Sequence, residues 1–252
     1  MRVEIVVSLL WLAPTVSCHG AVTSYTIDGK VHPGYEGFAP ATSPPTIQWQ
    51  WEDPRYYWLI PRPQPDYNPT MNVNDIKMRC NGGSSADLTA TLKVGTNITA
   101  NWKQWTHAQG PVMVWLYDCG GDFKSCRGDK QAWFKIDQMG LWGSNLNSEN
   151  WGTAIVLKQL KWSNKIPSNL KPGKYLLRHE LLALHQANTP QFYAECAQVV
   201  IEGSGTAQPP SPFMKSIPGY APQNDPGITI DIYQGGRTSY DPPGGAVWSG
   251  FE

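Results

Sequence analysis

The chain has 252 residues, and its 20 Lys and Arg balance its 20 Asp and Glu, so the formal net charge is zero. This balance argues against a protein that binds nucleic acid or an anionic membrane surface. Only 16% of the residues are charged, whereas Gly (24), Pro (22) and Trp (12) are abundant. That composition is typical of a loop-rich secreted β protein with aromatic surfaces.

The first 18 residues have the pattern of a secretory signal peptide. Arg2 precedes an apolar run over residues 5–13, and Val16 and Cys18 fit the small residues expected before a cleavage site. We therefore predict a signal peptide over residues 1–18 and a secreted, extracellular mature chain that forms one domain, residues 19–252. No later apolar run is long enough to cross a bilayer. The new N-terminus would be His19, whose α-amine and imidazole could chelate one metal ion.

Short β-rich runs separated by turn residues follow the predicted cleavage site. A strand over residues 21–27 ends at an Asp-Gly turn signal, and a Pro- and aromatic-rich stretch over residues 33–69 is predicted to be a long irregular loop. Further strands are predicted at Leu88–Leu92, Asn97–Trp102, Val112–Tyr117, Trp133–Ile136, Thr153–Leu157, Tyr175–Leu184, Phe192–Ile201 and Ile228–Tyr233. This pattern predicts an all-β fold, an immunoglobulin- or fibronectin-like β-sandwich with long loops that carry a flat face.

The cysteines indicate disulfide bonds. Cys18 would leave with the signal peptide, and the other four allow three pairings in an oxidising compartment. The favoured pairs are Cys119–Cys126, which closes a short loop, and Cys80–Cys196, which ties the two halves of the chain together. A metal site built from cysteines is the alternative. The sequon Asn97-Ile98-Thr99 predicts glycosylation of Asn97.

His107 is the first candidate metal ligand within the chain. It stands before the apolar run at 112–117, beside a Gly-Pro turn, where a side chain can project from the rim of a sandwich. Taken alone, such a histidine is more often a surface or hydrogen-bonded residue. If His19 is the N-terminus, however, one amine and two imidazoles provide three nitrogen donors, and that set suits Cu(II).

Two more strands carry polar residues at positions of equal parity. In the predicted strand that begins near Gln191, the side chains of Gln191 and Tyr193 lie on one face. In the run Tyr175–His185, the residues His179 and His185 share a parity but stand at opposite ends. Each pair alone is weak evidence, because a packed tyrosine or histidine is commoner than a metal neighbour.

Together these motifs resemble those of fungal lytic polysaccharide monooxygenases of auxiliary activity family nine, formerly classed as glycoside hydrolase family sixty-one. The matching motifs are His19-Gly20, His107-x-x-Gly110-Pro111, Trp133-Phe134-Lys135-Ile136-Asp137, Tyr175-Leu176-Leu177-Arg178-His179-Glu180, Leu184-His185, Gln191-Phe192-Tyr193 and Cys196-Ala197-Gln198. They extend from His19 to about Tyr233, and they are specific as a set rather than singly.

The resemblance implies a copper centre. His19, through its amine and ring, and His107 would hold one copper ion in a histidine brace, with Tyr193 at the axial position. His185 and Gln191 would be the pair that forms hydrogen bonds beside the metal. The loop between them is shorter than in many family members, which keeps His179 as the alternative to His185. The family's disulfides agree with the pairing favoured above.

The resemblance also implies a reaction and its partners. The reaction is oxidative cleavage of a β-1,4-glucan, cellulose foremost and hemicellulose as an alternative, at C1 and/or C4 with a reductant and O2 or H2O2. A small-molecule reductant or cellobiose dehydrogenase would supply electrons to a monomeric enzyme. A flat substrate asks for aromatic platforms, and Tyr25 and Tyr220 are the candidates. Ordinary packing is the alternative for Tyr25.

Two other classes of protein fit the sequence less well. A glycoside hydrolase needs two carboxylates across a cleft, and Glu180 and Glu195 are candidates that no recognisable motif supports. A non-catalytic copper- or carbohydrate-binding protein would not need Gln191 and Tyr193 in addition to the brace.

Overall fold

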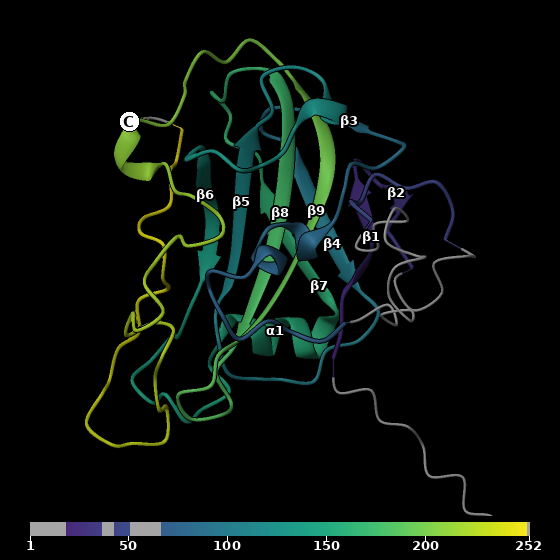
Figure 1. The fold of residues 1–252 in the computed structure, drawn as a ribbon. Coiled ribbons are helices and arrows are strands. Elements are labelled where there is room, and N and C mark those ends of the chain that lie inside the picture. Colours follow the sequence, from purple (N-terminus) through teal and green to yellow (C-terminus); the bar gives the residue numbers. More distant parts are fainter. Residues whose placement is uncertain (1–18, 37–42, 51–66, 251–252) are drawn as a thin grey trace, which may run out of the picture.

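The structure is a computed structural model that describes residues 19–36, 43–50 and 67–250. The predicted signal peptide lies outside the described residues, as does part of the predicted long loop, including Trp51, Tyr56, Tyr57 and Trp58. The described residues form nine strands and one α-helix (Figure 1).

In chain order these elements are β1 (Val22–Ile27), β2 (Lys30–Pro33), β3 (Ala90–Lys93), β4 (Asn97–Trp102), β5 (Val112–Asp118), β6 (Trp133–Met139), α1 (Gly152–Gln159), β7 (Lys161–Lys165), β8 (Gly173–Ala183) and β9 (Gln191–Glu202). Single 3-10 turns lie at Ile76–Met78, Cys80–Gly82, Phe123–Ser125 and Ser211–Phe213.

The strands form two sheets that pack face to face. One sheet has the order β2-β1-β4-β7, and the other has the order β3-β9-β8-β5-β6. Every pairing is antiparallel except that of β3 with β9. This arrangement confirms the predicted β-sandwich.

The principal core fills the space between the two sheets. Along β7, for example, buried and exposed residues alternate, so Trp162 and Asn164 point inward while the residues between them face solvent. Side chains from both sheets, among them Ile98, Val114 and Leu177, meet in one buried cluster. The period-two pattern that predicted the strands is the cause, because it gives each strand one apolar face.

The five-stranded sheet is covered on its outer face as well. All residues of β5 except the last are buried, and so are nine consecutive residues of β8. Their outward side chains belong to a second buried cluster, together with apolar residues of the chain beyond β9. We call residues 217–245 the C-terminal segment. It runs along the side of the molecule on which β5 and β6 lie (Figure 1).

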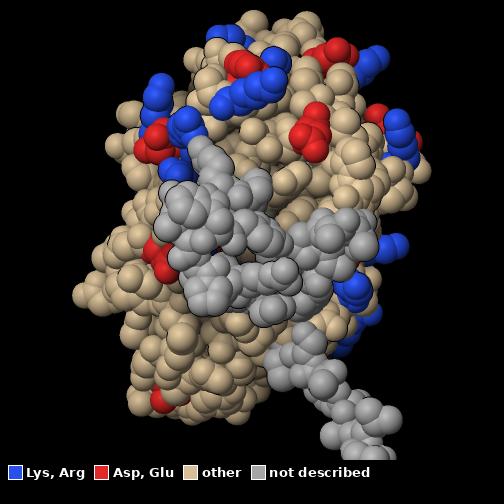
Figure 2. Space-filling model, turned by 45° about the vertical axis from the view of Figure 1, so that its right-hand side comes forward, with Lys and Arg blue, Asp and Glu red and all other residues tan. Residues whose placement is uncertain are grey.

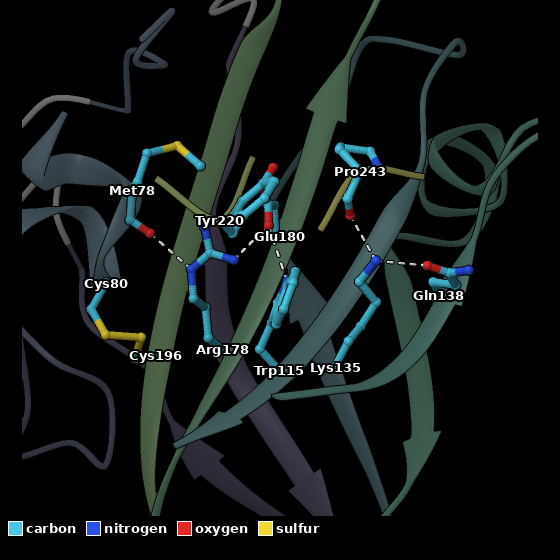
Figure 3. A network of polar contacts seen from close by, with 10 residues as sticks. All are labelled: Met78, Cys80, Trp115, Lys135, Gln138, Arg178, Glu180, Cys196, Tyr220 and Pro243. Carbon is cyan, nitrogen blue, oxygen red and sulfur yellow. Dashed lines mark hydrogen bonds and ion pairs between the residues drawn. A yellow bond between two sulfur atoms is a disulfide. The ribbon is translucent and has the colours of Figure 1, made fainter. Parts of the chain in front are cut away.

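A buried polar network fastens the C-terminal segment to the sheet (Figure 3). The carboxylate of Glu180, which has no exposed area, accepts hydrogen bonds from Trp115 Nε1 at 3.2 Å and from Tyr220 Oη at 2.8 Å. It also pairs with Arg178 Nη1 at 2.5 Å, and Arg178 Nε donates to the carbonyl of Met78 at 2.8 Å. A buried charge with several partners avoids the large cost of an unpaired one.

Lys135 on β6 makes the second attachment to the C-terminal segment. Its Nζ donates to the carbonyl of Pro243 at 2.7 Å and to Gln138 Oε1 at 2.8 Å (Figure 3). It also donates to the carbonyl of Gly245 at 2.9 Å. The same ammonium lies 5.0 Å from the ring centroid of Trp115. Because Lys135 is fully buried, all of its polar capacity is used within the protein.

Two predicted strands are wrong. Residues Thr153–Leu157 lie in α1, where Thr153 Oγ1 donates to the carbonyls of Ala108 at 2.7 Å and Gly110 at 3.0 Å. A short apolar run cannot be assigned to a strand or a helix by periodicity alone. Residues Ile228–Tyr233 show the alternating burial of a strand, but they form turns and irregular chain. Their apolar side chains pack in the second cluster, and the backbone pairs with no strand in the part of the chain that the structure describes.

Both predicted disulfides are confirmed. Cys80 and Cys196 are joined across a sequence separation of 116 residues, and Cys119 and Cys126 across a separation of 7 residues. The first bond attaches the turn at Cys80–Gly82 to β9.

Candidate metal centre

The fold brings the predicted site residues to one end of the sandwich. His19 precedes β1, and His107 precedes β5. His185 follows the end of β8, while Gln191 and Tyr193 stand at the start of β9. Because β8 is antiparallel to both β5 and β9, its end and their beginnings share one edge of the sheet. Residues distant in the sequence therefore become neighbours.

Three rings converge at this end. The ring centroids of His19 and His107 lie 6.4 Å apart, and those of His19 and Tyr193 lie 5.8 Å apart. The centroids of His107 and Tyr193 are 6.2 Å apart, with Tyr193 Oη 3.4 Å from His107 Nε2. Both histidines are half-buried, whereas Tyr193 is buried. The arrangement leaves two imidazoles and a phenol around a common point at the rim.

His185, rather than His179, joins this group. The ring of His185 stacks on that of His107 with centroids 3.9 Å apart and planes inclined by 7°. His179 instead lies fully buried in the middle of β8, where its Nε2 is 3.0 Å from Asn164 Oδ1. Of the two histidines that share a parity on this strand, only the one beyond its end reaches the rim.

Gln191 and Tyr193 form a direct hydrogen bond. Tyr193 Oη donates to Gln191 Oε1 at 2.9 Å, as their shared face on β9 predicts. The bond orients the amide of Gln191, so that the NH2 group on the opposite side of the amide is the end available as a donor. Both side chains are nearly covered, which restricts their motion.

Four residues to which the sequence analysis assigned no role shape the centre. The side chain of Gln104 donates to the carbonyl of His19. Trp105 Nε1 donates to the carbonyl of His107 at 2.6 Å, and its ring meets the His107 and Tyr193 rings edge-on. Gly20 and Gly110 permit close approach, since a Cβ there would lie 1.7 Å from Gln104 O and 1.8 Å from Leu182 O, respectively. The two glycines stood within quoted motifs, but Gln104 and Trp105 carried no signal.

The surroundings of His107 and His185 favour their neutral forms. Burial lowers the pKa of His107 to about 4, with smaller contributions from His185 and His19. Burial likewise lowers the pKa of His185, and the charge of His19 adds to the effect. A neutral imidazole has a lone pair to offer a metal ion, as ligation requires.

The donor set is compatible with copper only if it gains one nitrogen. Among the described residues, no cluster of three or more His, Cys, Asp or Glu side chains is arranged to hold a metal ion. Two imidazoles supply two donors, and an α-amine on His19 would supply the third. Three nitrogens with a nearby phenol match the preference of Cu(II) for tetragonal nitrogen and oxygen ligands, so the residues present fit the implied metal.

The two predicted aromatic platforms need correction. Tyr25 has no exposed area and lies in the core between the sheets, because its position on β1 points inward. Tyr220 is 6% exposed, stacks on Trp115 at 5.3 Å and donates to Glu180. Neither ring can stack on a sugar. Among the described residues, Tyr233 is an exposed aromatic residue near the centre; it is 50% exposed, and its Oη donates to the carbonyl of His185 at 2.8 Å.

Two further sequence predictions concern the surface and the membrane. Asn97 is exposed at the start of β4, where its side chain is accessible, and its glycosylation stays a prediction. In the ranges that the structure describes, no helix has the length and apolar character that a membrane-spanning segment requires.

Comparisons with known proteins agree with the geometry. The sequence profile of Auxiliary Activity family 9 (formerly GH61) matches residues 19–240. The AA9 family lytic polysaccharide monooxygenase D of Thermothelomyces thermophilus is 49% identical over 96% of this chain and 93% of its own length. The AA9 family lytic polysaccharide monooxygenase B of Heterobasidion irregulare is 40% identical over 98% of this chain and 99% of its own.

Solved structures give the same result. The crystal structure of a cellulose-active polysaccharide monooxygenase from M. thermophila superposes with a TM-score of 0.82 at 48% identity, covering 92% of this chain and 99% of the other. The family match, the relatives and the shared fold all extend over nearly the whole described chain. The protein belongs to Auxiliary Activity family 9 of lytic polysaccharide monooxygenases.

Proposed function

We propose that this protein is a secreted, copper-dependent monooxygenase that cleaves cellulose or a related β-1,4-glucan oxidatively, at C1 and/or C4. The observation that carries the proposal is the convergence of His19, His107 and Tyr193 at one rim, with ring centroids 5.8–6.4 Å apart. A reductant, either a small molecule or cellobiose dehydrogenase, supplies the electrons, and the monomer acts through a single catalytic domain over residues 19–252.

Copper binding depends on removal of residues 1–18. Cleavage after Cys18 turns the peptide nitrogen of His19 into an α-amine, which together with the rings of His19 and His107 makes three nitrogen ligands. Tyr193 completes the surroundings of the ion. The family match beginning at residue 19 supports this N-terminus. When bound, copper supplies one-electron redox chemistry and the activation of O2 or H2O2.

The side chains beside the centre have fixed orientations, so each presents a particular atom as a hydrogen-bond donor or as a site for a proton. Tyr193 Oη holds Gln191 by its Oε1, so the amide NH2 is directed away from the phenol and can donate a hydrogen bond at the centre. The ring of His185 stands parallel to that of His107 and can hold or release a proton at its nitrogens. Trp105 and Tyr193 are both buried, and their rings meet edge-on on the inner side of the centre.

The surface around this end suits a neutral polysaccharide. The end of the molecule at which β8 ends and β9 begins is the lower end in Figure 1, where α1 lies. On the face shown in Figure 2, Lys, Arg, Asp and Glu gather above, and few charged side chains lie toward this end. The exposed ring of Tyr233 offers a stacking surface for a sugar ring. The similar M. thermophila monooxygenase is cellulose-active, which further supports a cellulosic substrate.

The substitution His107→Ala tests the function. The variant is expected to lose copper binding and oxidised products while it retains adsorption to cellulose, because His107 is a ligand and not part of the sugar surface. His32→Ala, on β2, is the matched control and is expected to behave as wild type. Products are analysed by mass spectrometry with and without ascorbate. Unoxidised sugars formed without reductant would show a hydrolase instead.

A further inference from the structure

The C-terminal segment holds the loop that carries His185. Tyr233 Oη donates to the carbonyl of His185 at 2.8 Å, and Asn188 N–H donates to the carbonyl of Ile230 at 2.9 Å. From the other side, Leu184 N–H donates to the carbonyl of Gln109 at 2.9 Å, in the stretch that joins His107 to β5. The backbone on either side of the His185 ring is therefore tied to two different parts of the chain.

The C-terminal segment is itself fixed to the rigid sheet. Tyr220 is bonded to the buried carboxylate of Glu180, and Lys135 binds the carbonyl of Pro243 (Figure 3). Lys135 also binds the carbonyl of Gly245. Tyr240 Oη adds an internal bond to the carbonyl of Gly227 at 2.6 Å. Because both ends of the segment are attached to the sheet by buried groups, its position is defined where it meets the His185 loop.

Tyr233 differs from Tyr220 and Tyr240, the other two tyrosines of the C-terminal segment. Tyr220 and Tyr240 are held by burial of their rings, whereas half of Tyr233 is exposed, so less of its ring is packed against the protein. Its hydroxyl bonds a backbone carbonyl of the protein rather than pointing to solvent. The hydroxyl and the ring face therefore have separable tasks, one directed to the loop and the other to the outside.

We propose that Tyr233 is a positioning residue for His185: its hydroxyl fixes the backbone of the loop and thereby keeps the His185 ring stacked on His107. This inference rests on the proposed function for its consequence in catalysis, but not for its geometry. The length of the hydroxyl–carbonyl contact and the 3.9 Å stacking distance are the two observations that it connects.

Two variants separate the hydroxyl from the ring. Tyr233→Phe removes only the hydroxyl, and Tyr233→Ala removes the ring as well. Tyr175→Phe is the matched control, since it deletes a tyrosine hydroxyl that donates to a carbonyl, that of Lys171 at 2.7 Å, near the opposite end of β8. Thermal unfolding is followed for all three variants to establish that each one folds.

The first readout needs no copper. In the metal-free protein, the ring protons of His185 are shifted in NMR spectra by the stacked His107 ring, and both Tyr233 variants are expected to change this shift. In the copper-loaded protein, the electron paramagnetic resonance spectrum of Cu(II) is expected to change in the same two variants. Neither spectrum is expected to change in Tyr175→Phe.

The rates and the binding then separate positioning from substrate contact. Loss of one hydrogen bond, about 0.5–1.5 kcal/mol, predicts a roughly two- to tenfold fall in oxidised-product formation for Tyr233→Phe. Its adsorption to cellulose stays at the wild-type level, whereas Tyr233→Ala loses adsorption. Wild-type NMR and resonance spectra for Tyr233→Phe would overturn the inference. A wild-type protein that binds no copper would overturn the proposed function. The NMR comparison of the metal-free proteins would still test whether Tyr233 positions the His185 ring.

Discussion

The rings of His185 and His107 are stacked, with centroids 3.9 Å apart and planes inclined by only 7°. An imidazole nitrogen ligates a metal ion in the plane of its own ring, at about 2.0–2.1 Å for a typical divalent ion. Two parallel rings at this separation therefore do not share one ion. The stacking therefore allows only one of these two rings to ligate an ion. His107, which lies 6.4 Å from His19 and 6.2 Å from Tyr193 between ring centroids, is the ligand that we propose, and His185 would lie beside it.

This distinction predicts the behaviour of His185→Ala. The copper dissociation constant is expected to change by less than about tenfold, whereas oxidised-product formation falls roughly 10- to 100-fold, the usual loss when a side chain beside a metal centre is removed. Titration calorimetry measures the first quantity and product mass spectrometry the second. His32→Ala serves as the control. A loss of copper as complete as in His107→Ala would make His185 a ligand and contradict the stacking argument.

Gly20 tests whether the path of the chain at His19 matters. A Cβ on residue 20 would lie 1.7 Å from the carbonyl oxygen of Gln104, so Gly20→Ala must displace the chain next to His19. We expect copper affinity to fall roughly tenfold or more, equivalent to about 1.4 kcal/mol. Gly235→Ala is the control, since nothing lies within 4 Å of its Cβ position. Unchanged copper affinity in Gly20→Ala would show that His19 tolerates displacement.

The buried Arg178–Glu180 pair is expected to be costly to break and cheaper to replace. Glu180→Leu leaves the Arg178 guanidinium without its anion in a site with no exposure, so the free energy of unfolding should fall by about 3–5 kcal/mol. The double variant Arg178→Met, Glu180→Leu should lose clearly less than the sum of the two single variants. Denaturant unfolding measures each value.

An exposed ion pair provides the comparison for that experiment. Lys158 and Glu149 are 3.4 Å apart, and the side chains of both are 64% exposed. Glu149→Gln is expected to change the free energy of unfolding by no more than about 1 kcal/mol, because solvent screens the pair. For the buried pair, the contradicting result is additivity: if the double variant loses as much free energy of unfolding as the two single variants together, the charges of Arg178 and Glu180 are not coupled.

Lys135 predicts a pH dependence of stability. Burial lowers its pKa in the folded protein to about 7, whereas the unfolded chain has the ordinary value of about 10.5. Between these values the unfolded state binds more protons than the folded state, so the contribution of Lys135 to stability rises with pH from about 7 to about 10.5 and is lost as pH falls through 7. The melting temperature of the wild type should therefore rise relative to that of Lys135→Met across this window. Parallel pH profiles for the two proteins would contradict the shift.

Local patterns in the sequence determined the strands and most of the candidate site. Alternation of apolar residues has the period of a strand, so β4, β5, β8 and β9 could be placed to within a few residues. The parity of Gln191 and Tyr193 likewise predicted that they share a face, and the structure joins them by a hydrogen bond. These features depend on neighbours in sequence, which a pattern can represent.

Contacts between distant segments decided the rest. Tyr25 and Tyr220 were predicted to face a substrate, but Tyr25 is buried between the two sheets, and Tyr220 packs against Trp115 of the five-stranded sheet. His179 and His185 have the same parity, and only the length of β8 places the first in the core and the second at the rim. Burial is a property of what packs against a residue, so the sequence alone could not separate Tyr233, which lies open, from the tyrosines that do not.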